Sequence, residues 1–141
     1  MNPRLPSAVA TVMLLWGLPL AAQPREDAAR AGMLTEAERA SDRGDHAQAL
    51  DLATRAGAIR MSPSLRGFIA QEHHALGHVL EAYDAAVLCE REARADPTAR
   101  RREQTIATCS ALSAELGPRI GRVTVRVPDP PPGARVRVAD A

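Results

Sequence analysis

Gly44-Asp45-His46-Ala47-Gln48-Ala49-Leu50 has a counterpart 33 positions further along the chain, Gly77-His78-Val79-Leu80-Glu81-Ala82-Tyr83. Both segments begin with glycine and carry alanine five positions later. The same offset separates Ala56 from Cys89, while Pro63 and Pro97 are 34 positions apart. A glycine between two helix-forming segments is typical of a tight turn. The spacing therefore predicts two consecutive helical hairpins of about 34 residues each.

Five breaks interrupt a chain that otherwise has helix-forming composition from Gln23 to Leu116. They are Gly44-Asp45-His46, Ser62-Pro63-Ser64, Gly77-His78, Asp96-Pro97-Thr98 and Gly117-Pro118. Ser62 and Asp96 each precede a proline, so their side chains can accept hydrogen bonds from free amides while proline occupies the first helical position. Both residues are therefore predicted to begin a helix. Together the breaks predict a mainly α protein of five helices joined by short turns.

Apolar residues fall at helical spacing within the last three segments. They are Leu65, Phe68, Ile69 and Leu76 in the third, Leu80, Tyr83 and Val87 in the fourth, and Ile106, Cys109, Leu112 and Leu116 in the fifth. Aromatic residues make up only 2% of the chain, so the core must be built from alanine and aliphatic side chains. The helix from Thr98 to Leu116 is predicted to cap the second hairpin, and the polar residues 100–103 are predicted to face water.

These turns, each followed by a small and a larger apolar residue, resemble the tetratricopeptide repeat family. The resemblance is carried by residues 44–50, Gly77, Ala82 and Tyr83, with further small residues at Ala37 and Ala70. It implies a repeat domain over 23–117, made of two hairpins and a capping helix. It also implies a groove formed by the first helix of each hairpin. The partner-binding residues would then be Leu34, Glu38, Gln71 and His74.

The N-terminal region predicts a secretory signal peptide over residues 1–22. Arg4 precedes an apolar run over 8–20, and the small pair Ala21-Ala22 follows it. The run is shorter than the ~20 residues that a membrane-spanning helix needs, and its end suits signal peptidase. Cleavage near Ala22 would release the chain into the periplasm or the medium, with no membrane span remaining.

The charge balance argues against a nucleic acid partner. The chain holds 18 basic and 17 acidic residues, and loss of Arg4 with the signal peptide leaves it formally neutral. A nucleic acid-binding surface needs an excess of basic side chains to neutralise phosphates. We therefore expect a protein partner or self-association.

Two cysteines in an exported chain are expected to form a disulfide. Cys89 lies near the end of the fourth predicted helix and Cys109 lies in the fifth. Antiparallel helices joined by a short turn bring such positions close, with a stagger of about one helical turn in this case. Two buried free thiols are the alternative, because both positions fall on apolar helix faces.

His74 and His78 are four positions apart, the spacing at which one helix face can present two imidazoles to a metal ion. A zincin motif requires glutamate directly after the first histidine, where this chain has Ala75, and Gly77 interrupts the helix before His78. No other grouping of nucleophile, base and oxyanion donors stands out. We therefore expect no enzyme activity, no cofactor and no metal, with a metal-dependent hydrolase as an alternative.

The character of the sequence changes after Gly117-Pro118. Residues 122–127 and 135–138 alternate polar and apolar side chains, and the proline-rich segment 128–133 separates them. Such alternation predicts half-buried strands, so 118–141 is expected to form a β-hairpin. The segment resembles the opening of β-sandwich modules of the PEGA or carboxypeptidase-regulatory type. A truncated module, docking on the helices and addition to the sheet edge of a partner are all open.

These features predict an exported, non-enzymatic protein–protein interaction module, acting as an adaptor or scaffold in the cell envelope. The sequence does not identify its partner. The main alternative is a structural element that holds a neighbouring β module, or the remnant of a longer multidomain protein without a binding role of its own.

Overall fold

The computed structural model describes residues 23–121 and the positions 124, 126, 128, 132 and 133. Its elements are α1 (Gln23–Asp42), α2 (His46–Ile59), α3 (Pro63–Ala75), α4 (Val79–Ala95), α5 (Arg102–Leu116) and the short 3-10 helix η1 (Gly117–Arg119). The prediction of a mainly helical protein is confirmed. The predicted signal peptide and most of the predicted β-hairpin lie outside the described residues, so both stay predictions. No helix within 23–121 combines the length and the apolar character needed to cross a membrane.

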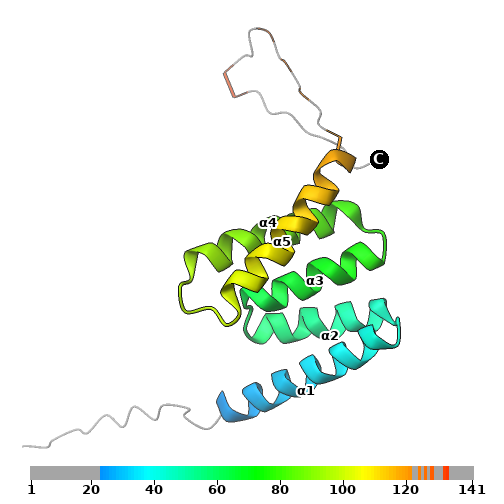
Figure 1. Ribbon diagram of the computed structural model, residues 1–141, viewed down its shortest axis with the longest axis vertical. Helices are drawn as coiled ribbons and strands as arrows, with labels where there is room; N and C mark the ends of the chain where they lie inside the picture. Colours follow the sequence, from blue (N-terminus) through cyan, green and yellow to red (C-terminus); the bar gives the residue numbers. More distant parts are fainter. Residues whose placement is uncertain (1–22, 122–123, 125, 127, 129–131, 134–141) are drawn as a thin grey trace, which may run out of the picture.

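The helices pack as two pairs and a fifth helix (Figure 1). α1 lies along α2, α3 lies along α4, and α5 packs against α4 and α3. α3 also contacts α2, so it joins the two pairs. One apolar cluster surrounds Leu65 and Ile69, where α3 meets the first pair. A second cluster surrounds Leu112 and Leu116, where α3 and α4 meet α5.

Alanine provides most of the buried core. The enclosed alanines are Ala37, Ala40, Ala49, Ala53, Ala56, Ala70, Ala82, Ala86 and Ala93. Side chains this small let helices approach closely, but each removes little apolar area from water. In α4 the apolar residues Leu80 and Val87 are 57% and 38% exposed, whereas Cys89 is buried. Helical spacing identifies a helix without showing which of its faces the neighbouring helices cover.

All five predicted breaks fall at helix ends, four of them between consecutive helices and the fifth after α5. Gly44 and Gly77 follow α1 and α3 with φ angles of 78° and 76°, the left-handed region that favours glycine. Ser62 Oγ accepts a hydrogen bond from the Leu65 amide at 3.3 Å, and Pro63 opens α3. The predicted helix start at Ser62 is therefore confirmed.

Asp96 does not begin a helix, so that prediction is wrong. It ends α4, and its Oδ1 accepts hydrogen bonds from the hydroxyl and the amide of Thr98 at 2.7 and 2.9 Å. These bonds lower the pKa of the Asp96 carboxyl, the hydroxyl having the largest effect. Arg100, Arg101 and Glu103 are exposed as predicted, whereas Arg102 is half-buried. Its guanidinium donates to the carbonyls of Ala93 and Arg94 at 3.1 and 3.2 Å. These contacts satisfy free carbonyls at the end of α4, and the capping helix begins only at Arg102.

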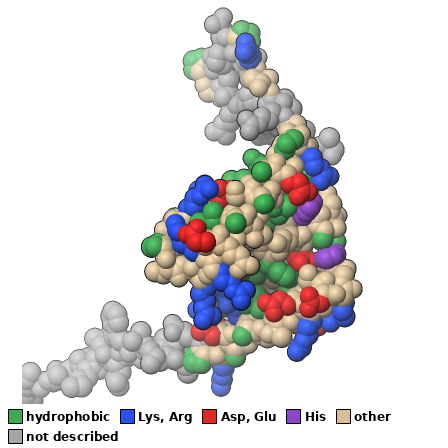
Figure 2. Space-filling view, in the orientation of Figure 1, with side chains coloured by type: hydrophobic (Ala, Val, Ile, Leu, Met, Phe, Trp, Pro, Cys, Tyr) green, Lys and Arg blue, Asp and Glu red, His purple; other side chains and the backbone are tan. Residues whose placement is uncertain are grey.

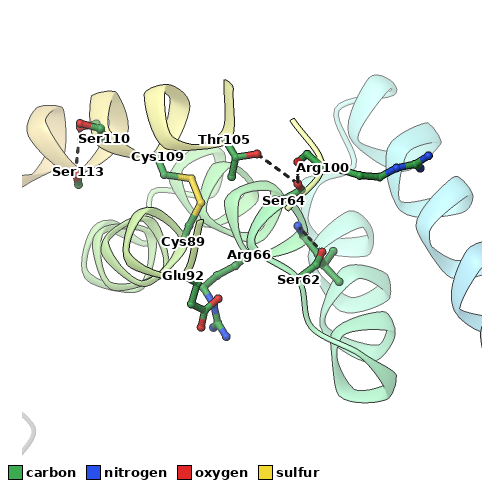
Figure 3. Close-up of a disulfide and its surroundings, with 11 residues drawn as sticks. Ser62, Ser64, Arg66, Cys89, Glu92, Arg100, Thr105, Cys109, Ser110 and Ser113 are labelled. Atoms are coloured by element: carbon green, nitrogen blue, oxygen red, sulfur yellow. Dashed lines mark hydrogen bonds and ion pairs between the residues drawn. A yellow bond between two sulfur atoms is a disulfide. The ribbon is translucent and has the colours of Figure 1, made fainter. Parts of the chain in front are cut away.

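A disulfide joins Cys89 of α4 to Cys109 of α5, with the two Cα atoms 6.1 Å apart (Figure 3). The bridge lies directly against α3 at Gly67. A Cβ atom at this glycine would lie 3.0 Å from Cys109 Sγ and 3.2 Å from Cys89 Sγ. Glycine inside a helix costs about 1 kcal/mol relative to alanine. Here an added methyl group would force the sulfur atoms to shift by a few tenths of an ångström. Three helices meet at this point.

Removing the disulfide with the double substitution Cys89→Ala and Cys109→Ala should lower the free energy of unfolding by about 3 kcal/mol. The cysteines are 20 positions apart, and opening a loop of that size returns this much chain entropy to the unfolded state. In a domain of this size the melting temperature should fall by about 12–24 °C, measured by circular dichroism. Reducing agent should lower the melting temperature of the wild type but leave the double variant unchanged. Equal melting temperatures for the oxidised wild type and the double variant would contradict this account.

Gly67→Ala should destabilise the disulfide-bonded protein, because two helices hold the sulfur atoms in place against the new methyl group. In the variant without cysteines the same substitution should stabilise the protein by up to about 1 kcal/mol, since only the gain in helix propensity remains. Gly32→Ala in α1 is the matched control, because no atom lies within 4 Å of its added Cβ. The control should stabilise both backgrounds equally. Urea denaturation of all variants gives the coupling energy between Gly67→Ala and removal of the disulfide. If the two changes were additive, the contact between residue 67 and the disulfide would not contribute to stability.

Candidate functional site

Two adjoining cavities open on the side of the molecule formed by α1, α3 and α5. The first has a volume of about 180 Å³ and lies between α1 and the first half of α3. Its wall is mostly apolar, with Leu34 and Ala37 from α1 and Leu65 and Phe68 from α3. Since a cavity of about 150 Å³ holds a benzene ring, the first cavity has room for one large apolar side chain.

The second cavity continues from the first toward α5 and has a volume of about 290 Å³. Glu38, Ser64 and Phe68 line both cavities, which together we call the α1/α3/α5 groove. The second cavity adds polar side chains from α3, α5 and the loop before it: Gln71, Arg101, Gln104, Thr105 and Thr108. Gly67 and Cys109 also line it, so the disulfide supports this part of the groove. In Figure 2 the surface between α1 and α5 is recessed, and arginine side chains lie at its left-hand end.

Three of the four residues predicted to bind a partner line the groove. Leu34 lies in the first cavity, Gln71 in the second and Glu38 in both. His74 lines neither cavity, and its Nε2 lies 3.3 Å from Oε1 of Glu115 on α5. The role of these residues in partner binding stays a prediction.

Sequence reasoning missed the residues that α5 and the loop before it bring to the groove: Arg101, Gln104 and Thr108. Arg101 has φ 52° and ψ 35°, a left-handed backbone that costs about 1–2 kcal/mol for a residue other than glycine. The neighbouring contacts hold it there, since Arg102 is fixed to the end of α4 and Ser64 Oγ donates to the Arg100 carbonyl at 3.4 Å. The predicted break at 96–98 covers only the first part of this loop, and the expected helix start at Asp96 would place Arg101 inside a helix.

A buried carboxylate fastens the first helix pair to α3. Glu72 is 3% exposed, and its Oε1 accepts a hydrogen bond from the Ser41 hydroxyl at 2.7 Å. Its Oε2 lies 2.8 Å from Nδ1 of His46, the first residue of α2. A catalytic triad of these residue types needs the hydroxyl to face the imidazole. Here both groups bind the carboxylate instead, which suits a structural role.

The turn after α3 brings His73 and His78 together, rather than His74 and His78. The Nδ1 atoms of His73 and His78 lie 3.3 Å apart, and the ring centroids 5.6 Å apart. Burial, followed by the charge of His78, lowers the pKa of His73, while Glu81 acts in the opposite direction. In the part of the chain that the structure describes, no group of three or more histidine, cysteine or acidic side chains is arranged to hold a metal ion.

Glu72→Ala should lower the free energy of unfolding by about 2–3 kcal/mol. The substitution removes a hydrogen bond to a charged group and leaves Ser41 and His46 without their partner. Glu38→Ala is the control, because this exposed α1 carboxylate should change stability by no more than about 0.5 kcal/mol. Urea denaturation measures both. Equal effects of the two substitutions would show that the buried network contributes nothing.

Comparison with known proteins provides no relative, because no family model, no curated protein and no solved structure matches this chain. Function is therefore inferred from the geometry and the chemistry of the groove.

Proposed function

We propose that this chain is an exported, non-enzymatic interaction module whose α1/α3/α5 groove binds a short segment of a protein partner. One observation carries the proposal: two cavities that share Glu38, Ser64 and Phe68 form a continuous groove across three helices. Pockets that combine an apolar wall with a few polar groups are typical of binding sites.

The lining indicates what kind of segment fits. The first cavity, walled by Leu34, Leu65 and Phe68, suits one aromatic or branched apolar side chain. The second offers amide and hydroxyl groups that can form hydrogen bonds with a peptide backbone. Glu38 and Arg101 carry opposite charges in this second cavity, so the bound segment needs no strong net charge. We infer an apolar anchor residue followed by polar residues.

Two further features support an exported repeat module. Disulfides persist in oxidising compartments, so the Cys89–Cys109 bridge supports export, in line with the predicted signal peptide. The 33-residue offset between the turns at Gly44 and Gly77 supports a tetratricopeptide-like interpretation of 23–117. In such repeats, stacked helical hairpins present an extended binding surface. An adaptor or scaffold in the cell envelope is the role that combines these features.

The test uses a random dodecapeptide library selected on the immobilised protein, followed by fluorescence anisotropy with the enriched peptides. Gln71→Arg combined with Thr108→Arg changes two exposed side chains of the second cavity without touching the core. We expect this double substitution to weaken binding about tenfold or more, the loss of one interface hot spot.

The control is Leu80→Arg, which changes an exposed apolar residue of α4 outside the groove and should leave binding unchanged. The selected peptides should share an apolar anchor residue. Two results would count against the proposal: no enrichment of any peptide, or enriched peptides whose binding depends on Leu80 and not on the groove.

A further inference from the structure

The turn after α3 determines which side chains meet at its ends. The Gly77 amide donates to the His74 carbonyl at 3.0 Å, and the His78 amide donates to the His73 carbonyl at 2.9 Å. These two bonds around a left-handed glycine form a Schellman motif, which ends a helix. The motif brings the side chains of its own first and last residues, here His73 and His78, into contact. In most proteins that contact is apolar. Here it is made by two imidazoles.

The turn after α1 provides an internal comparison. The amides of Gly44 and Asp45 donate the same two hydrogen bonds to carbonyls at the end of α1. The side chains at the two ends of this motif are those of Ala40 and Asp45. Asp45 then caps α2 by accepting from the Gln48 amide at 3.2 Å. His78 occupies the position of Asp45 in the second turn, but its side chain makes no capping bond to α4. Its imidazole faces the other histidine of the motif instead.

We propose that His73 and His78 form a binding site for Zn²⁺, with both Nδ1 atoms as ligands and water at the remaining positions. Zn–N bonds of about 2.0–2.1 Å at the tetrahedral angle place two ligand nitrogens about 3.3–3.4 Å apart. The observed separation of the two Nδ1 atoms is 3.3 Å.

The surroundings of the pair suit a cation. His78 is exposed and His73 is half-buried, so an ion can reach both rings from solvent. Imidazole nitrogen is a common zinc ligand. The negative charge of Glu81, in the first turn of α4, acts on His73 and favours a bound cation.

Binding needs a change of tautomer and a turn of each ring, because the two Nδ1 atoms face each other in the hydrogen bond and must converge on the ion instead. The hydrogen bond between the two Nδ1 atoms needs one of them to donate a proton and the other to accept it. For Zn²⁺ to bind, the proton on the donating Nδ1 moves through solvent to Nε2 of the same ring, so that each ring carries one proton on Nε2 and both Nδ1 atoms are free for the metal. With two protein ligands the site is weaker than a structural zinc site with four. The site is independent of the α1/α3/α5 groove, so each can be tested alone.

Isothermal titration of the untagged protein with Zn²⁺ tests the site. His78→Asn removes one imidazole and supplies a preferred N-cap residue for α4, so the fold should be kept. We expect His78→Asn and His73→Ala each to weaken Zn²⁺ binding at least about tenfold, the loss that even an outer-shell partner of a ligand can cause. His74→Ala removes a histidine from the same helix end and should leave the affinity unchanged.

Thermal unfolding provides a second readout. Zn²⁺ should raise the melting temperature of the wild type, because a ligand that binds the folded state stabilises it, and should not do so in His78→Asn. Mg²⁺ prefers oxygen ligands and should have no effect. Retention of wild-type Zn²⁺ affinity when both His73 and His78 are replaced would overturn the proposal. So would loss of binding in His74→Ala, or no binding by the wild type at millimolar Zn²⁺.

Discussion

The contact between the disulfide and the backbone of α3 at Gly67 is the constraint on which the remaining structure depends. The core consists mainly of alanines, which remove little apolar area from water, so packing alone leaves a domain of this size marginally stable. The Cys89–Cys109 bridge compensates by restricting the unfolded chain. In the folded protein the bridge lies against Gly67, where an added Cβ would be closer to both sulfur atoms than ordinary van der Waals contact. α3, α4 and α5 are thereby held at one point.

The groove depends on the same contact. Gly67 and Cys109 line its second cavity, and α5 supplies the polar side chains that face Glu38 and Phe68. The first cavity is formed by α1 and α3, with Ser62 from the turn before α3, and needs no contribution from α5. The same covalent bond therefore also positions α5, the third helix of the groove.

Two turns with the same hydrogen bonds carry different chemistry. At the first, Asp45 caps the next helix, and Glu72 fastens the neighbouring residues Ser41 and His46 to α3. At the second, the corresponding position holds His78, which contacts an imidazole instead of capping α4. A repeated backbone shape fixes where side chains meet, and the residues at those positions determine whether the contact stabilises the fold or offers a site to an ion.

Local signals were sufficient for the helices and most of their ends, because Gly44, Gly77 and Ser62 act through bonds to residues a few positions away. Asp96 carries the same signal as Ser62 and fails, since Arg102 completes the end of α4 and holds the intervening residues as a loop. The exposure of Leu80, the burial of Glu72 and the polar half of the groove could not be predicted in this way. The contacts of Glu72 join residues 26 and 31 positions apart, and Ser64 meets Thr105 across 41 positions. Side chains this far apart acquire their burial and their partners only when helices pack, because packing determines which face meets a neighbour and which meets water.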